Sequence, residues 1–299
     1  MEKQNTTCAF IALVGRPNVG KSSILNRLIG QKIAIVSDKP QTTRTKITGI
    51  LTKGEMQLVF IDTPGLHKPR NALGEHMVKA VGDGMADVDC CVLVVEAHTP
   101  VAAAELELIE RFKKRKLKAV LAINKIDLLK DKSALLARIA DYTALFDFEA
   151  VVPLCAKTGD GVETLFDELK KFAVPSVHYF DDGSLTDQPE RVLAAEIIRE
   201  KLLRLLDKEI PHGLAVSIER FKERENADIL DIEAVIYCER QSHKGIVIGK
   251  NGAMLKKAGQ LARADLEAFF EIKINLKLWV KVKENWRVRQ GSIHDFGLD

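Results

Sequence analysis

The first 175 residues alternate between short apolar runs and stretches in which apolar residues recur every three or four positions. Short apolar runs between polar turns are typical of buried strands, and the three-to-four spacing is typical of helices. The apolar runs are Cys8–Val14, Met56–Ile61, Cys90–Val95, Ala119–Ile123 and Val151–Cys155, and helical stretches between them include Ala103–Lys114 and Val162–Phe172. This alternation predicts an α/β domain with a mostly parallel sheet and helices on both faces.

One segment departs from the parallel pattern. Lys46–Thr52 alternates apolar and polar residues, a Lys-Gly-Glu turn follows, and Met56–Ile61 comes directly after it. Because so short a turn joins antiparallel strands, we expect one antiparallel strand at the edge of the sheet.

A different pattern begins after residue 190. Residues 174–189 contain two Pro, one Gly and three Asp, which is typical of a linker. Helical spacing and strand-like alternation then follow one another in the segments Arg191–Leu206, Leu214–Phe221, Ile229–Tyr237, Ala253–Phe270 and Ile272–Val282. We therefore expect a first domain over residues 1–175, a linker over 176–190, a smaller α+β domain over 191–290 and a tail over 291–299.

Charge and composition add a partner class to this picture. The chain is 46% hydrophobic with a net charge of only +3, but residues 240–299 hold 12 basic and 6 acidic residues. A basic stretch favours an anionic partner, either nucleic acid or a membrane surface, although a solvated charged face is the alternative. Five cysteines without metal spacing, no leader segment and no apolar run near about 18 residues predict an intracellular protein with at most peripheral membrane contact.

Residues 15–22 read G-R-P-N-V-G-K-S, which matches the P-loop pattern between a predicted strand and the predicted helix Ser22–Ile29. The glycines let successive backbone N–H groups point into one hollow that holds phosphates. Lys21 reaches the outer phosphates, and the Ser22 hydroxyl ligates Mg²⁺. The expected nucleotide-binding residues of this loop are Gly15, Arg16, Pro17, Asn18, Val19, Gly20, Lys21, Ser22 and Ser23.

Two further segments predict the phosphate and metal chemistry. Asp62-Thr63-Pro64-Gly65 follows a predicted strand, so Asp62 is expected to hold Mg²⁺ and the Gly65 N–H to face the γ-phosphate. The loop P-Q-T-T-R at residues 40–44 offers two hydroxyls, of which spacing favours Thr43 as a third Mg²⁺ ligand beside Ser22 and Asp62. The predicted catalytic set is Lys21, Thr43, Asp62 and Gly65, and Thr63, Pro64 and Leu66 complete this part of the nucleotide site.

The identity of the nucleotide base is predicted by the segment Asn124-Lys125-Ile126-Asp127, which follows the predicted strand Ala119–Ile123. The Asp127 carboxylate can accept hydrogen bonds from both N1–H and N2–H of guanine, and adenine offers no such pair of donors. Asn124 is expected to fix the loop, and the Lys125 stem to cover a base face. In Cys155-Ala156-Lys157 the Ala156 N–H is expected to donate to guanine O6.

Together, the motifs G-R-P-N-V-G-K-S, T-T-R, D-T-P-G, N-K-I-D and C-A-K resemble, in order, the translation-factor-related GTPases and specifically the Era/TrmE/EngA type of G domain. The resemblance covers about residues 7–175 and implies GTP and GDP with Mg²⁺ as ligands and Thr43 as the switch threonine. The last motif departs from the usual S-A-K, but its expected contact is a backbone N–H. Members with Asn at position 18 resemble potassium-stimulated enzymes, which makes Asn18 a candidate K⁺ ligand; stabilisation of the P-loop turn is the alternative.

Leu66 occupies the position where many GTPases carry a water-orienting Gln, and an aliphatic side chain cannot do this. No arginine is an obvious finger, and we expect Arg16 and Arg44 to lie on the solvated surface. The sequence therefore predicts a GTPase that is slow alone and is stimulated by K⁺ or a partner.

The second domain carries the sequence G-K-N-G at Gly249–Gly252, between two predicted helices. Glycines at this spacing let a nucleic-acid backbone approach the next helix N-terminus. The expected RNA-binding residues are Gly249, Lys250, Asn251, Gly252, Lys256 and Lys257. The element order resembles a type II KH domain, which implies single-stranded RNA of about four nucleotides; a glycine turn in an ordinary α+β domain is the alternative. Trp286 is expected either in the core or stacked on a base.

A G domain followed directly by a type II KH domain resembles the Era family of bacterial GTPases over about residues 7–290. The resemblance implies a protein that binds 16S ribosomal RNA near its 3′ end, acts in 30S subunit assembly and is partly associated with the cell membrane. We also expect a cytoplasmic monomer. Two alternatives stay open: a membrane-surface or cell-cycle regulatory GTPase, and an RNA-binding module whose nucleotide site is only structural.

Overall fold

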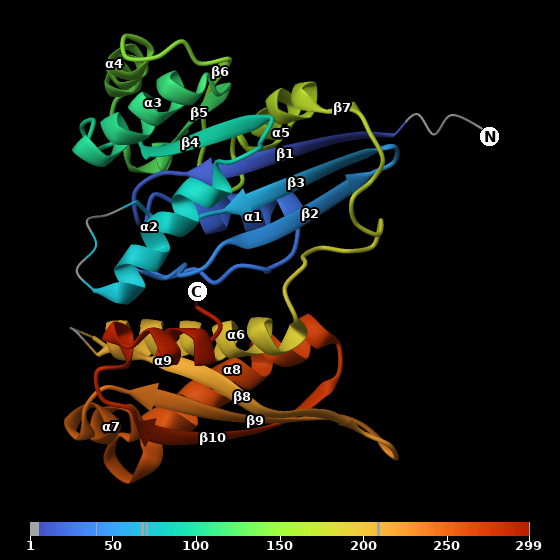
Figure 1. Cartoon of the computed structure of the whole chain (residues 1–299), viewed down its shortest axis with the longest axis vertical. Coiled ribbons are helices and arrows are strands. Elements are labelled where there is room, and N and C mark those ends of the chain that lie inside the picture. The colour runs from blue at the N-terminus through green and yellow to red at the C-terminus, as the bar shows by residue number, and fades with distance from the viewer. Residues whose placement is uncertain (1–5, 40, 67–68, 70, 208–209, 299) are drawn as a thin grey trace. The chain divides into compact units, whose positions relative to one another are not determined.

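The computed structural model describes residues 6–39, 41–66, 69, 71–207 and 210–298, and it forms two compact units (Figure 1). The first unit comprises Met1–Ala34, Thr43–Lys68 and Met77–Asp187. The second comprises Ile35–Thr42, Pro69–His76 and Gln188–Asp299. Two short segments of the N-terminal half therefore belong to the second unit. Pro40 of the predicted switch loop lies outside the described residues.

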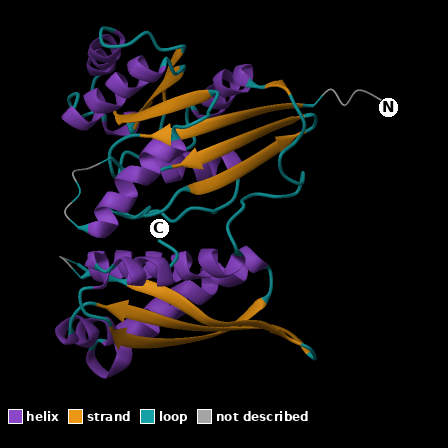
Figure 2. Ribbon diagram, viewed as in Figure 1, coloured by secondary structure: helices purple, strands orange, loops and turns teal. Residues whose placement is uncertain are grey.

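The first unit is built on a seven-stranded sheet whose main path runs β2-β3-β1-β4-β5-β6 (Figure 2). Only β2 on this path is antiparallel to its neighbour, β3, as the short turn between them predicted. A two-residue strand, β7, adds a second antiparallel pairing, with β1. The strands are β1 (Thr7–Val14), β2 (Ile47–Lys53), β3 (Met56–Asp62), β4 (Cys90–Glu96), β5 (Ala119–Asn124), β6 (Ala150–Pro153) and β7 (Val174–Pro175).

Helices cover this sheet because their apolar faces need burial. Leu108 and Phe112 of one helix and Tyr142 of the next pack with Leu93 and Leu121 of the central strands. The mostly parallel α/β architecture expected from the alternating pattern is confirmed. The helices of this part of the chain are α1 (Lys21–Ile29), α2 (Ala72–Gly84), α3 (Ala103–Arg115), α4 (Lys132–Thr143) and α5 (Val162–Leu169).

Much of the segment expected as a linker is held by the first unit. The Gln57 side-chain oxygen accepts hydrogen bonds from the N–H groups of Tyr179 (2.8 Å) and Phe180 (3.1 Å). Farther along, the Thr186 hydroxyl donates to the Thr48 carbonyl at 2.6 Å. The compact unit consequently extends to Asp187, and few residues remain between it and helix α6.

The second unit is a three-stranded sheet in the order β10-β9-β8, with β8 and β9 antiparallel and β9 and β10 parallel. Helices α6 and α8 pack together against the sheet (Figure 2). Their apolar residues share one core with it. Trp286 is fully buried and donates to the Gly213 carbonyl at 2.9 Å, so its role is in the core. The elements are α6 (Glu190–Leu205), β8 (Ala215–Arg224), β9 (Ala227–Cys238), α7 (Gln241–Ile248), α8 (Ala253–Phe270), β10 (Lys273–Val282) and α9 (Gln290–Asp295).

A search of the described residues for a helix of bilayer-spanning length and apolarity finds none.

Candidate functional site

The predicted nucleotide motifs meet at one edge of the first sheet. Strands β1, β3, β4 and β5 are parallel, so their carboxyl ends lie on the same side. The P-loop follows β1, Asp62 ends β3 and Asn124 ends β5. Register pairs Leu13 with Asp62, which brings the start of the P-loop next to the metal-binding motif.

Two glycines of the P-loop have backbone conformations and surroundings that a larger residue would not fit. Gly15 has φ +151°, and a methyl group there would lie 2.4 Å from the Val94 carbonyl oxygen. Gly20 has φ +106°, and a methyl group there would lie 2.1 Å from the Asn124 amide nitrogen. The loop can therefore pass close to the neighbouring strands only because these residues lack Cβ.

The Lys21 ammonium group lies inside the curve of the P-loop. It donates to the carbonyl oxygens of Gly15 at 3.3 Å and Arg16 at 2.9 Å. Burial lowers the pKa of Lys21 to about 8, and the nearby Asp62 carboxylate opposes this shift. A phosphate group would bring the compensating negative charge that this buried cation needs.

Three oxygen-bearing side chains converge beside Lys21. The Ser22 hydroxyl donates to Asp62 Oδ2 at 2.6 Å, and its oxygen lies 3.0 Å from the Thr43 hydroxyl. Asp62 is fully buried, and its Oδ1 has no hydrogen-bond partner among the described residues. Burial raises the pKa of Asp62 to about 6, against the opposing effects of Lys21 and Ser22. A hard divalent cation fits this oxygen set, because it would satisfy the orphan Oδ1 and compensate the buried charge.

The two threonines of the switch loop differ in what their hydroxyls contact. The Thr42 hydroxyl donates to the Lys39 carbonyl at 2.6 Å and lies 2.7 Å from the Ser37 hydroxyl. The Thr43 hydroxyl instead lies beside Ser22. Of the two hydroxyls, the one of Thr43 is therefore positioned with the other candidate Mg²⁺ ligands.

At the base end of the site, Asn124 ties two loops together. Its side-chain nitrogen donates to the Val19 carbonyl at 2.7 Å, and its oxygen accepts from the Ala156 N–H at 3.0 Å. The N–H that we expected to face guanine O6 is thus engaged with Asn124 in this structure. The Cys155 thiol donates to Asp127 Oδ1 at 3.1 Å, so cysteine orients this carboxylate in the place where serine is usual.

Gly65 and Leu66 also lie against the P-loop. A methyl group on Gly65 would come within 2.4 Å of the Pro17 nitrogen. The Leu66 N–H donates to the Gly15 carbonyl at 3.1 Å, and its side chain packs into the core with Val14 and Leu93. Leu66 is therefore a core residue, and it offers no group that could orient water.

The expectation that Arg16 and Arg44 are solvated surface residues is wrong. Arg44 is buried, and the Arg16 side chain is only 25% exposed. Arg16 Nε donates to Glu105 at 2.6 Å, and Nη2 donates to the Thr99 hydroxyl at 2.8 Å. The Arg16 side chain is thus drawn to the start of helix α3, because the fully buried Glu105 carboxylate needs a cationic partner.

The sequence did not predict the roles of Glu105 and Glu96, two carboxylates that bind side chains of the nucleotide site. Glu105 accepts from Arg16, from the Ala102 N–H at 2.8 Å and from Tyr142. Glu96 at the end of β4 pairs with Lys125, so the lysine head is held while its stem lies in the base loop. One signal was available: Glu105 occupies a place in the apolar stripe that continues with Leu108 and Phe112.

In the second unit, the G-K-N-G loop joins α7 to α8, as the sequence predicted. Gly249 (φ +75°), Asn251 (φ +50°) and Gly252 (φ +77°) have positive φ values that turn the chain sharply. A methyl group on Gly249 would lie 2.7 Å from Met254 Cβ. Lys250, Lys256 and Lys257 are exposed around the start of α8. Basic side chains thus surround a helix N-terminus that can accept phosphate.

Comparisons with known proteins agree with this geometry. A family model described as a 50S ribosome-binding GTPase matches residues 10–125, and a KH-domain model matches residues 209–287. The GTPase Era of Clostridioides difficile is 50% identical over 97% of this chain and 98% of its own length. The GTPase Era of Ruminiclostridium cellulolyticum is 47% identical over 96% of each chain.

Solved structures extend the similarity. An Era variant from Aquifex aeolicus bound to GDP·AlF4⁻ is similar with a TM-score of 0.94, 33% identity and coverage of 98% of this chain and 99% of that one. An Era complex with MgGDPNP and nucleotides 1506–1542 of 16S ribosomal RNA has the same scores and coverage. With P-loop, guanine and KH motifs in place over nearly the full length, this chain belongs to the Era family of GTPases.

Proposed function

We propose that this GTPase binds 16S ribosomal RNA near its 3′ end and acts as a GTP-dependent switch in assembly of the 30S ribosomal subunit. One observation carries the proposal: a protein of the same family, similar over 98% of this chain, has been solved with MgGDPNP and nucleotides 1506–1542 of that RNA. The exposed lysines around the G-K-N-G loop provide the positive charge that an RNA backbone needs.

We assign the nucleotide roles as follows. The P-loop N–H groups and Lys21 hold the phosphates, and Asp127 accepts from guanine. Ser22, Thr43 and Asp62 hold Mg²⁺, which neutralises charge on the phosphates during transfer. The Ser22 hydroxyl oxygen already lies within hydrogen-bonding distance of both the Thr43 hydroxyl and the Asp62 carboxylate.

Water must be oriented without a side chain at position 66, because Leu66 is in the core. We propose that backbone groups of Thr43 and Gly65 orient it, since Thr43 lies beside Ser22 and Gly65 lies against Pro17 of the P-loop. Turnover without a stimulating ion or partner should then be slow.

We propose Asn18 as a ligand for K⁺. It is an exposed non-glycine residue in a turn of the P-loop, with φ +64°. The test compares GTP hydrolysis in K⁺ and Na⁺ buffers for the wild type and for Asn18→Asp and Asn18→Ala. Faster hydrolysis in K⁺, lost in Asn18→Ala, would support the assignment, and equal rates of the wild type in both salts would remove it.

The RNA assignment is tested with an oligonucleotide of nucleotides 1506–1542, the fragment named for the Era complex. We expect Gly249→Ala and Lys250→Ala to weaken its binding, the first by straining a position of positive φ beside Met254 and the second by removing a phosphate contact. Lys222→Ala, at an exposed lysine on β8, is the matched control. Equal binding of an RNA of scrambled sequence would contradict the ribosomal assignment while leaving GTP hydrolysis intact.

We also propose that the protein is a monomer and that residues 240–299, which carry 12 basic and 6 acidic residues, make peripheral contact with anionic lipid. The molar mass measured by light scattering in solution tests whether the protein is a monomer. Sedimentation with phosphatidylglycerol vesicles tests the contact, which should weaken with salt and compete with the RNA oligonucleotide if both use these residues. A lack of sedimentation at low salt would remove the membrane contact.

A further inference from the structure

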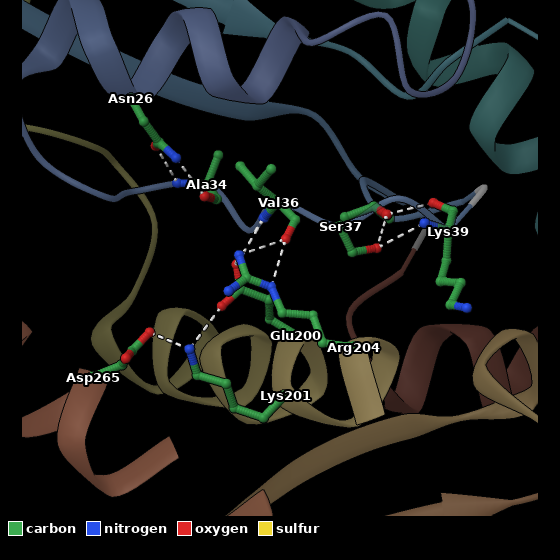
Figure 3. A network of polar contacts seen from close by, with 10 residues as sticks. Asn26, Ala34, Val36, Ser37, Lys39, Glu200, Lys201, Arg204 and Asp265 are labelled. Carbon is green, nitrogen blue, oxygen red and sulfur yellow. Dashed lines mark hydrogen bonds and ion pairs between the residues drawn. The ribbon is translucent and has the colours of Figure 1, made fainter. Parts of the chain in front are cut away.

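The segment that leads to the switch threonine is held by helix α6 within the second unit (Figure 3). Glu200 Oε1 accepts a hydrogen bond from the Val36 N–H at 2.9 Å. The Val36 carbonyl accepts from Arg204, at 3.1 Å from Nε and 2.9 Å from Nη2. Arg204 also donates to Glu200 at 2.9 Å. Both backbone polar groups of Val36 are therefore bound by one pair of side chains, which fixes its orientation as well as its position.

A second contact fixes the end of the same segment. Arg199 Nη2 donates to the carbonyl of Thr42, and Glu196 holds the guanidinium at 2.7 and 2.6 Å. Arg199 is only 2% exposed, so its hydrogen bond to Thr42 is protected from water. Thr42 is the residue before Thr43, and moving its carbonyl changes the peptide that carries the Thr43 N–H.

The residues on either side of this segment are fixed by the first unit. Asn26 of α1 accepts from the N–H groups of Ile33 (3.0 Å) and Ala34 (2.9 Å) and donates to the Ala34 carbonyl (2.7 Å). Thr43 contacts Ser22. The chain thus changes from one unit to the other between residues 34 and 36 and back between residues 42 and 43. A shift of α6 would be passed to Thr43 through a single peptide bond.

Glu200 and Arg204, which bind the backbone of Val36, are also linked to α8, the helix that follows the G-K-N-G loop. Glu200 is fully buried, and its Oε2 accepts from Lys201 at 3.1 Å. Lys201 pairs at the same time with Asp265 of α8 (Figure 3). Helix α8 begins at Ala253, immediately after Gly252. A continuous path of polar contacts therefore runs from α8 through Lys201 and Glu200 to the backbone of Val36.

We propose that Arg199, Glu200 and Arg204 are positioning residues for GTP hydrolysis, and that the Lys201–Asp265 pair couples RNA bound at the G-K-N-G loop to the placement of Thr43. The coupling rests on the proposed RNA binding, whereas the positioning role does not. If RNA binds more tightly to one arrangement of α8 against α6, it shifts Glu200, Arg204 and the bound Val36 toward the positions that belong to that arrangement. By linkage, the state of the switch segment changes RNA affinity by the same factor.

The positioning role is tested with Glu200→Gln in the full chain, since glutamine keeps the size of the side chain and removes its charge. We expect kcat for GTP to fall about tenfold, with GDP affinity and KM changed less than about threefold, because the groups that hold the nucleotide lie elsewhere. Arg204→Gln should act in the same direction. Glu225→Gln, at a glutamate of the same unit whose side chain is 86% exposed, is the matched control. Circular dichroism melting separates loss of fold from loss of positioning.

The coupling is tested with Asp265→Asn and the oligonucleotide of nucleotides 1506–1542. We expect this variant to keep the basal rate within about twofold, while the affinity difference for RNA between the GDPNP and GDP states, on the order of tenfold for a coupled pair of sites, is lost. RNA affinity in the GDP state should stay unchanged, because Asp265 does not lie in the loop. Arg263→Gln, at an exposed residue of α8 two positions before Asp265, is the control.

Each result counts for or against one part of the proposal. Normal kcat in both Glu200→Gln and Arg204→Gln would overturn the positioning role. An unchanged difference in RNA affinity between nucleotide states in Asp265→Asn would overturn the coupling. Absence of RNA binding by the wild type would instead contradict the proposed function, and the kcat measurement would still decide the positioning role.

Discussion

The hydroxyl of Tyr142 donates a 2.6 Å hydrogen bond to the carboxylate of Glu105, and both residues are fully buried. Burial and the neighbouring carboxylate raise the pKa of Tyr142, so the hydroxyl stays protonated and remains a donor. The same carboxylate accepts from Arg16 of the P-loop. A residue of helix α4 thus supports the nucleotide site through one intermediate side chain.

Tyr142→Phe should lower the free energy of unfolding by about 1–3 kcal/mol, because it removes one donor from a buried carboxylate. GDP affinity should fall by a smaller amount, since Glu105 keeps Arg16 as a partner. Urea unfolding and a fluorescent GDP titration measure the two effects. Tyr179→Phe, at a tyrosine that is 58% exposed, should change stability by less than about 0.5 kcal/mol; equal effects of the two substitutions would contradict a special role for the buried pair.

Gly65→Ala should reduce GTP hydrolysis by about 10²-fold, because displacement of a catalytic loop by 1 Å has effects of this size. Its methyl group would lie 2.4 Å from the Pro17 nitrogen and 2.5 Å from its Cα, so the loop of Gly65 must move. Single-turnover hydrolysis gives the rate. Gly82→Ala is the control: no atom lies within 4 Å of a methyl there, and alanine in helix α2 should stabilise the protein by about 0.5–1 kcal/mol. Hydrolysis at the wild-type rate by Gly65→Ala would show that the loop yields without loss of function.

The strands on the main path of the first sheet, the position of the P-loop and the order of helices and strands in the second domain could be predicted, because each depends on local periodicity or on a motif at the end of a strand. The short strand β7 was not predicted. The partners of Arg16 could not. Its 2.6 Å contact with Glu105 joins residues far apart in sequence, and the pairing depends on the register by which α3 packs on the sheet.

The switch segment shows the same limit more strongly. Residues 35–42 read as a loop of the G domain, and nothing local indicates that Val36 is bound by Glu200 and Arg204. Lys201 lies among the buried residues of helix α6. Burial of a lysine requires a partner, but only the fold shows that the partner is Asp265.

Asp127→Asn should lower GDP affinity by about 10²-fold or more and raise the affinity for xanthosine diphosphate (XDP). The carboxylate can accept from two donors of guanine, whereas an amide accepts through one atom and donates through the other, which matches the C2 carbonyl of xanthine. Competition titrations with both nucleotides measure the exchange. Cys155→Ala, which removes only the 3.1 Å thiol contact to Asp127, should keep the preference for guanine. If Asp127→Asn binds XDP no better than the wild type does, Asp127 does not read the base.

Asp231 on β9 gives the second unit a pH dependence. It accepts from Arg224 at 2.7–3.1 Å and from Asn275 of β10 at 2.7 Å, and these donors hold the pKa of Asp231 well below its usual range. The unfolded chain, with an ordinary pKa of about 4, takes up the proton first as pH falls. The stabilisation is therefore fully present above about pH 4 and is lost as pH falls further toward the folded pKa.

Replacing this carboxylate should remove that part of the acid sensitivity. We expect the melting temperature of the wild type to fall between pH 5 and pH 3 more steeply than that of Asp231→Asn, and the variant to be the less stable of the two at pH 6 because an amide pairs poorly with Arg224. Melting followed by circular dichroism across this pH range gives both comparisons. Asp228→Asn, at an exposed carboxylate of the same strand, should keep the wild-type slope. Parallel slopes for the wild type and Asp231→Asn would mean that the pairing across β8, β9 and β10 does not depend on this charge.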